Sequence, residues 1–292
     1  MTTPAITQAM INAYDEYTHL TLDRRGFMEK LTKLAGSGAA AAAIAPLLAA
    51  NPAAAEIVPA DDSRLKGEDI TWPGASGNMM GYLVHPADQS GKLPTVIVIH
   101  ENRGLTGHIR DVTRRVALEG FVALGIDYLS PLGGTPADEE KAREMFGQLD
   151  AAQLVANGVA TVAFLKGHEL GTGKVGAVGF CWGGGTVNTL AVNAPDVNAG
   201  VAYYGAQPKD AAEIAKIKAA LLLHYAGMDE RVNAGIDAYK AALEAAGKDC
   251  AIYVYEGAQH AFNNDSSAAR YNKEAADLAW SRTVAFFKEK LA

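Results

Sequence analysis

The chain has 292 residues, of which 49% are hydrophobic and 20% are charged, so it is long and apolar enough to bury a substantial core. Its formal net charge of −7 and the lack of a basic stripe argue against a nucleic-acid partner, because phosphate binding needs clustered Lys and Arg. Its two cysteines are too few for a disulfide framework and lack metal-ligand spacing, so we expect free thiols and no metal.

The N-terminal residues resemble a twin-arginine export signal. The paired Arg24 and Arg25 are followed by the weakly hydrophobic, Ala- and Gly-rich run 34–50, and Ala53-x-Ala55 offers a cleavage site. The run is about 17 residues long and is interrupted by Gly and Pro, which makes it marginal as a stable membrane span. The alternative is an ordinary Ala-rich helix that opens the domain.

We therefore expect two parts, a signal peptide over residues 1–55 and one mature domain over residues 56–292. The expected partner of Arg24 and Arg25 is the export machinery, and the expected location is periplasmic or secreted. Tethering to the membrane by an uncleaved signal is the alternative. Because export by this route follows folding in the cytoplasm, we do not assume a disulfide.

Strand and helix patterns alternate along the rest of the chain. The expected strands cover residues 79–86, 93–101, 121–128, 174–180, 197–205, 219–227 and 250–257. The expected helices cover residues 111–120, 136–168 in two pieces, 183–194, 232–246 and 268–290. This alternation predicts an α/β fold, with a mostly parallel central sheet covered by helices on both faces.

The motif "GFCWG", residues 179–183, places Cys181 where a small-residue strand runs into a helix. It fits the G-x-nucleophile-x-G turn with cysteine in place of serine, and its glycines would let a sharp turn hold the nucleophile in a strained conformation. The N-terminus of the following helix also favours a thiolate. The alternative is a small buried side chain without a chemical role.

Two further residues follow strands in an informative order. Asp229 comes just after the strand 219–227, and His260 comes just after the last strand. The order Cys181, Asp229, His260 is the nucleophile, acid and base order of an α/β-hydrolase. Singly, Asp229 could cap the next helix and His260 could be an ordinary loop histidine.

The segments "VIHENRG", "GFCWGG", "AGMDERV" and "GAQHAF" together resemble the dienelactone hydrolase family, along the whole length from residue 56. The resemblance implies an α/β-hydrolase fold and a resting contact between Glu101 and the thiol of Cys181. The backbone N–H groups of Trp182 and Asn102 would form the oxyanion hole. A neighbouring carboxylate disfavours the thiolate, whereas a histidine paired with Asp229 favours it.

The sequence departs from the family where two arginines are expected to bind a substrate carboxylate. Those positions hold Ser130 or Pro131 and Asn264. Arg103 could substitute for them or could be a solvated loop residue. Trp182 and Tyr128 could line the site, although aromatic side chains are often simple packing.

The interpretation is an enzyme that hydrolyses small esters or lactones through an acyl-cysteine intermediate, without a cofactor. His260 would remove the thiol proton and later activate water, while Asp229 orients His260. One alternative is a non-catalytic binding protein of this fold with a redox-sensitive thiol. The other is a broad acyl esterase or a peptidase.

Overall fold

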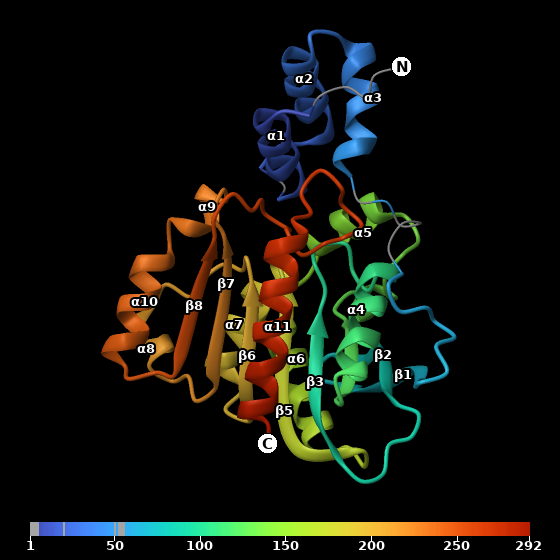
Figure 1. The fold of residues 1–292 in the computed structure, drawn as a ribbon, viewed down its shortest axis with the longest axis vertical. Coiled ribbons are helices and arrows are strands. Elements are labelled where there is room, and N and C mark those ends of the chain that lie inside the picture. Colours follow the sequence, from blue (N-terminus) through green and yellow to red (C-terminus); the bar gives the residue numbers. More distant parts are fainter. Residues whose placement is uncertain (1–5, 20, 50, 52–55) are drawn as a thin grey trace.

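The computed structural model describes residues 6–19, 21–49, 51 and 56–292, and its centre is one eight-stranded sheet (Figure 1). The spatial order of the strands is β1-β2-β4-β3-β5-β6-β7-β8. The strands are β1 Leu65–Gly74, β2 Gly77–Pro86, β3 Leu93–Ile99, β4 Val122–Asp127, β5 Gly171–Phe180, β6 Val197–Tyr203, β7 Ala220–Ala226 and β8 Cys250–Tyr255. Strands β3 to β8 are parallel, and β1 and β2 join one edge in antiparallel pairing.

Helices cover both faces of this sheet. One core lies between the sheet and α6, α7, α8 and α10, and a second lies between the opposite face and α4 and α11. The helical segments of this part are α4 Gly107–Leu118, η2 Ser130–Leu132, α5 Glu139–Phe146, α6 Ala151–Lys166, α7 Trp182–Asn193, α8 Ala211–Ile214, α9 Glu230–Asn233, α10 Ile236–Ala245 and α11 Lys273–Lys290. The predicted α/β fold with a mostly parallel sheet is therefore confirmed.

Burial explains which strands could be predicted from the sequence. All residues of β4 and β7 are buried, as expected for inner strands covered on both faces, and both read as continuous apolar runs. The edge strand β1 was not predicted, because six of its ten residues are exposed and it contains Pro73. The helix expected over 232–246 is divided between the short α9 and α10, and the last helix begins at Lys273 rather than 268.

Three helices precede the sheet and form a separate small layer, which we call the cap, over residues 6–19 and 21–49. They are α1 Gln8–Thr18, α2 Arg24–Ala35 and α3 Gly38–Leu48. Figure 1 shows the cap (blue) beyond the carboxyl ends of the parallel strands. The cap has its own hydrophobic cluster, made by Met10, Ala13, Tyr14, Tyr17, Phe27, Leu31, Ala41, Ile44 and Leu48.

The cap contains most of the segment interpreted as an export signal. Arg24 and Arg25 are exposed in the first turn of α2, and the expected cleavage site lies outside the described residues. Within the described residues, no single helix has the length and apolar composition to cross a membrane. Helices α2 and α3 together have the required length and composition, but their axes are bent by 112° where they meet. Export by the twin-arginine route stays a prediction.

The cap core predicts a local stability effect. Leu31 is fully buried in that core, whereas Leu34 on the same helix is 39% exposed. Leu31→Ala should destabilise the cap by about 2–5 kcal/mol, because the truncated side chain leaves a cavity, and Leu34→Ala should cost much less. Hydrogen exchange of full-length protein should show faster exchange in α1 to α3 for Leu31→Ala, with the strands unchanged. Equal exchange for both variants would contradict a packed cap.

Candidate active site

Cys181 lies at a strained turn between β5 and α7. Its φ of 57° and ψ of −113° fall in a region that L-residues rarely adopt, at a cost of about 1–3 kcal/mol. Its backbone N–H donates to the carbonyl of Tyr203 on the neighbouring strand at 3.0 Å, which fixes the turn to the sheet. The thiol is free and 8% exposed.

The flanking glycines are required by close backbone contacts. A Cβ at Gly179 would lie 2.1 Å from the carbonyl oxygen of Gly183, and a Cβ at Gly183 would lie 2.4 Å from that of Ile99. Neither position has room for a side chain, because the obstructing atoms belong to the backbone. The reason given for the glycines from the sequence therefore agrees with the contacts in the turn.

Asp229 and His260 form a buried pair at the carboxyl ends of β7 and β8. Asp229 Oδ2 accepts a hydrogen bond from His260 Nδ1 at 2.5 Å, and both residues are 5% exposed. Asp229 also caps α9, because its Oδ1 accepts from the N–H of Val232 at 3.2 Å. The two interpretations of Asp229 are thus compatible. Burial opposes its charge, but the hydrogen bond from His260 and the cation of Arg231 hold the pKa of Asp229 below its usual value.

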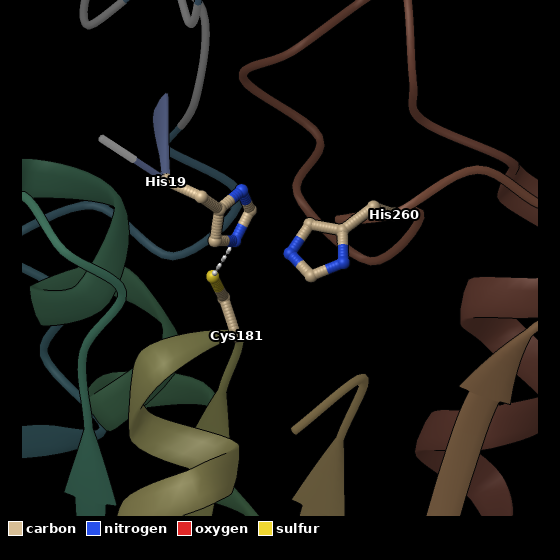
Figure 2. Close-up of side chains that lie close together, drawn as sticks. All are labelled: His19, Cys181 and His260. Atoms are coloured by element: carbon tan, nitrogen blue, oxygen red, sulfur yellow. Dashed lines mark hydrogen bonds between the residues drawn. The ribbon is translucent and has the colours of Figure 1, made fainter. Parts of the chain in front are cut away.

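His260 faces Cys181, and a second histidine lies with them. Figure 2 shows one ring nitrogen of His260 turned toward the thiol and His19. His260 Nε2 is buried and has no hydrogen-bond partner among the described residues. His19, which directly follows α1, places Nε2 3.3 Å from Cys181 Sγ, and its ring centroid lies 4.8 Å from that of His260.

The donor atoms of these three side chains, His19, Cys181 and His260, all lie within 4.8 Å of one another. Among the described residues, this is the one group of His, Cys, Asp or Glu side chains whose potential ligand atoms lie close enough together to hold a metal ion. Sγ already shares a hydrogen with His19 Nε2, and both Nδ1 atoms are held by hydrogen bonds with Asp15 and Asp229. These bonds leave both Nε2 atoms and Sγ facing one another, so the expectation that no metal is bound stays a prediction.

Both residues expected to form the oxyanion hole border the same cavity. Trp182 begins α7, and Asn102 lies in the turn after β3. The cavity has a volume of about 330 Å³ and is also lined by Cys181, His19 and His260. The side chain of Asn102 donates to the carbonyl of Thr18, so the turn is in contact with the cap.

Glu101 lies near the thiol but has a different described partner. Its Oε2 accepts from Asn264 Nδ2 at 2.9 Å, and its Oε1 is buried without a described partner. Glu101, Cys181 and His260 border a small cavity of about 30 Å³. The hydrogen bond described for Sγ is with His19 Nε2, so His19 of the cap occupies the position that the family resemblance gave to Glu101.

The two residues suggested for substrate binding differ in position. Arg103 borders the small cavity, but Nη2 lies 3.4 Å from Glu140 and Nε lies 4.0 Å from Glu139. Tyr128 is fully buried in the core, where its ring packs at 5.2 Å against Trp182. Trp182 itself lines the larger cavity.

Where the family arginines were expected, the structure has structural hydrogen bonds. The hydroxyl of Ser130 accepts from the N–H of Met80 at 2.8 Å, and Asn264 binds Glu101. Two other arginines, Arg143 and Arg231, line the 330 Å³ cavity. Sequence reasoning missed both, although Arg231 lies in the quoted segment "AGMDERV", because only the fold shows that their side chains reach the cavity.

Comparisons with known proteins agree with this geometry. The model of the "Dienelactone hydrolase family" matches residues 79–291, which begins after the cap and β1. A Methylorubrum extorquens protein named "Putative carboxymethylenebutenolidase" is 34% identical over 257 residues, covering 83% of this chain and 88% of its own. An Escherichia coli K12 protein with the same name is 33% identical over 257 residues, with coverages of 82% and 93%.

Solved structures show the same architecture. A Klebsiella pneumoniae structure named "Putative Dienelactone Hydrolase" has a TM-score of 0.69 and 29% identity, covering 77% of this chain and 99% of that one. The dienelactone hydrolase of Anabaena variabilis has a TM-score of 0.61 and 22% identity, with coverages of 78% and 100%, and it shows likeness of fold alone.

The turn at Cys181 predicts a strong contrast between two glycines in the first turn of α7. Gly183→Ala should destabilise the protein by about 1–3 kcal/mol and misplace the thiol, because its Cβ would meet the carbonyl oxygens of Ile99 and His100 at 2.4 and 2.5 Å. Gly185→Ala is the matched control, since its nearest contact is 3.4 Å. Thermal unfolding and thiol alkylation rates would test this, and equal behaviour of the two variants would contradict it.

Proposed function

Because the chain belongs to the dienelactone hydrolase family, whose members are hydrolases that act on ester and lactone bonds, we propose that it hydrolyses small esters or lactones through an acyl-cysteine intermediate. Cys181 is the nucleophile, and His260 is the general base that Asp229 orients. The observation that carries this proposal is the buried hydrogen bond between Asp229 and His260, next to a cysteine in a strained strand-to-helix turn.

The same arrangement supports a role for backbone amides in the reaction. An attack by Sγ on a carbonyl carbon places negative charge on the carbonyl oxygen, which preorganised N–H groups stabilise. The amide of Trp182 lies at the N-terminus of α7, where N–H groups have no partner within the helix. We assign the second amide to Asn102, which borders the same cavity.

The proposal predicts different roles for the two cysteines. Cys181→Ala should lower ester hydrolysis by about 10³-fold or more, because no nucleophile remains. Cys250→Ala should retain most activity. Cys250 begins β8, at the end of the sheet remote from the site, and burial together with Asp249 raises its pKa to about 12. Hydrolysis of p-nitrophenyl acetate by purified full-length variants measures both effects.

Further outcomes separate the alternatives. Cys181→Ser should also lose most activity, because a hydroxyl is a far weaker acid than a thiol. Full activity in Cys181→Ala would overturn the assignment of the nucleophile. Failure of the wild type to hydrolyse any lactone or aryl ester would indicate a binding protein, and cleavage of amides at rates like those of esters would indicate a peptidase.

The absence of the two family arginines predicts substrate preference. Uncharged esters and lactones should react at least as well as matched substrates that carry a free carboxylate. The expected family arginines are replaced by Ser130 and Asn264, and each missing charged hydrogen bond weakens carboxylate binding by about 1.5–3 kcal/mol. Arg143 and Arg231 line the cavity, but Glu140 and Asp15 pair with them at 3.2 and 3.5 Å.

The measurement is kcat/KM for pairs of substrates that differ only in a methyl ester versus a free acid distant from the reacting bond. A strong preference for the acid would contradict the prediction and would direct attention to Arg103, Arg143 and Arg231.

We also propose, from the sequence pattern alone, that Arg24 and Arg25 direct export by the twin-arginine route to the periplasm or outside the cell. Both arginines are exposed, which a recognition pair needs. Whether the working protein keeps or loses residues 1–55 then matters chemically, because the cap contacts Cys181.

A further inference from the structure

A histidine of the cap, which lies outside the residues matched by the family model, is in contact with Cys181. His19 belongs to a segment that precedes residue 79, where that match begins, yet its Nε2 lies 3.3 Å from Cys181 Sγ (Figure 2). The hydrogen bond described for Sγ is this one. His260 Nε2, which the proposed triad would direct at the thiol, has no hydrogen-bond partner in the described part of the chain.

His19 is held in place by polar contacts on two sides. Its Nδ1 donates to the carbonyl oxygen of Asp15 at 2.8 Å and lies 3.3 Å from the Asp15 carboxylate. The carboxylate also pairs with Arg231 Nε at 3.5 Å. Asp15–His19 thus differs from Asp229–His260, in which Nδ1 bonds directly to the carboxylate, although each histidine has an aspartate carboxylate within 3.3 Å of Nδ1.

The end of α1 that carries His19 is anchored to the hydrolase domain. Arg143 Nη1 donates to the carbonyl of Tyr17 at 3.0 Å, and Asn102 Nδ2 donates to the carbonyl of Thr18. These bonds satisfy two of the carbonyls that a helix leaves unpaired at its C-terminus. The placement of His19 therefore rests on contacts of the two residues that precede it as well as on its own side chain.

We propose that His19 is a fourth catalytic residue, which accepts the proton of the Cys181 thiol and so leaves His260 free to activate water. The inference rests on the proposed function, because it assumes that Cys181 is acylated. It makes the cap a working part of the active site, and it therefore requires that residues 1–55 stay attached, as they do when an export signal is not cleaved.

The proton transfers balance over one cycle. The Sγ–H bond breaks and the proton moves to Nε2 of His19, while Sγ bonds to the carbonyl carbon. The bond from that carbon to the leaving oxygen breaks, and the released alkoxide takes the proton from His19. In the second half, His260 Nε2 takes a proton from water, and hydroxide displaces the thiolate. The thiolate recovers that proton from His260, so ester and water become acid and alcohol.

The charges around His19 fit this role. Burial opposes a charge on the ring, but the neighbouring sulfur and Asp15 outweigh it and raise the pKa of His19 to about 9, while His260 acts in the opposite direction. Arg231 Nη2 lies 3.0 Å from His19 Nε2 and can only donate, so it competes with the thiol for the nitrogen lone pair. Once protonated, His19 loses this bond, and Asp15 offsets both cations.

The remaining charged and titratable groups face the thiol from the other elements. Glu101 follows β3 and borders the same small cavity as Cys181, together with Arg103 and Arg270. Tyr204 borders the larger cavity with its ring centroid 5.0 Å from that of His260, and burial, with smaller contributions from Glu101 and Cys181, strongly raises its pKa.

The cap leaves room for a substrate beside these groups. The cavity of about 330 Å³ that His19, Cys181 and His260 line together is large enough for a small ester. A segment that only blocked the site would fill this space. The open cavity favours a contribution to catalysis over inhibition.

The test separates the two halves of the reaction in full-length protein. Wild type, His19→Gln and His260→Gln are mixed rapidly with p-nitrophenyl acetate, and intact mass follows the acetyl group on Cys181. We expect His19→Gln to form the acyl-enzyme about 10²–10⁴-fold more slowly and to lose it at the wild-type rate. His260→Gln should form it readily and accumulate it. His85→Gln, a change on β2 away from the site, is the matched control.

A second measurement does not depend on ester chemistry. Iodoacetamide alkylation of Cys181 against pH should shift to higher pH in His19→Gln by at least about one unit, because the proton acceptor of the thiol is lost. The profile of His85→Gln should match the wild type. Imidazole added to His19→Ala should restore part of the acylation rate, which a purely structural role of His19 would not allow.

Three outcomes would overturn the proposal. They are an acylation rate in His19→Gln within a few-fold of the wild type, alkylation profiles that coincide, and faster turnover in His19→Gln, which would make the cap an inhibitor. Hydrogen exchange of α1 in each variant verifies that the cap remains docked. If the wild type itself forms no acyl-enzyme, the proposed function is wrong. If the wild type forms it and His19→Gln turns over ester at the same rate, only the role of His19 is wrong.

Discussion

The close approach of backbone to backbone at Cys181 is the constraint on which the rest of the site depends. Gly179 and Gly183 let β5 and α7 meet without a Cβ between them, and this contact forces Cys181 into a conformation with positive φ. The strain is tolerated because the hydrogen bond to Tyr203 and the surrounding parallel strands fix the turn. The thiol is thereby presented at the edge of the sheet where the loops carrying Asp229 and His260 also end.

The parallel sheet and the cap contribute to the site in different ways. The sheet positions its residues through short loops after buried strands, as the α/β architecture generally does. The cap acts through one helix end, whose unpaired carbonyls receive donors from Asn102 and Arg143. The result is a thiol next to two histidines, His260 bonded to the Asp229 carboxylate and His19 bonded to the backbone carbonyl of Asp15.

Sequence reasoning could predict the sheet and could single out the residues of the proposed triad, because their signals are local. Buried strands read as apolar runs, and the residues after them, such as Asp229 and His260, lie at one edge by topology. The thiol's hydrogen bond to His19 joins residues 162 positions apart, and His19 lies in a segment that composition alone assigns to export. No pattern near His19 signals such a contact. The edge strand β1 was not predicted for a different reason, because its mostly exposed residues show no periodic apolar pattern.

The cap has a practical consequence for how such a protein is produced. A chain with a twin-arginine leader is commonly expressed from its presumed cleavage site onward, here after Ala55. That truncation would remove every contact between the cap and the hydrolase domain, including the hydrogen bond on Sγ and the partners of Arg143 and Arg231. Arg143 would keep Glu140 but lose the carbonyl of Tyr17, and Arg231 would lose Asp15. Assays of the shortened protein would therefore report on a more cationic cavity and on a thiol without its hydrogen bond to His19.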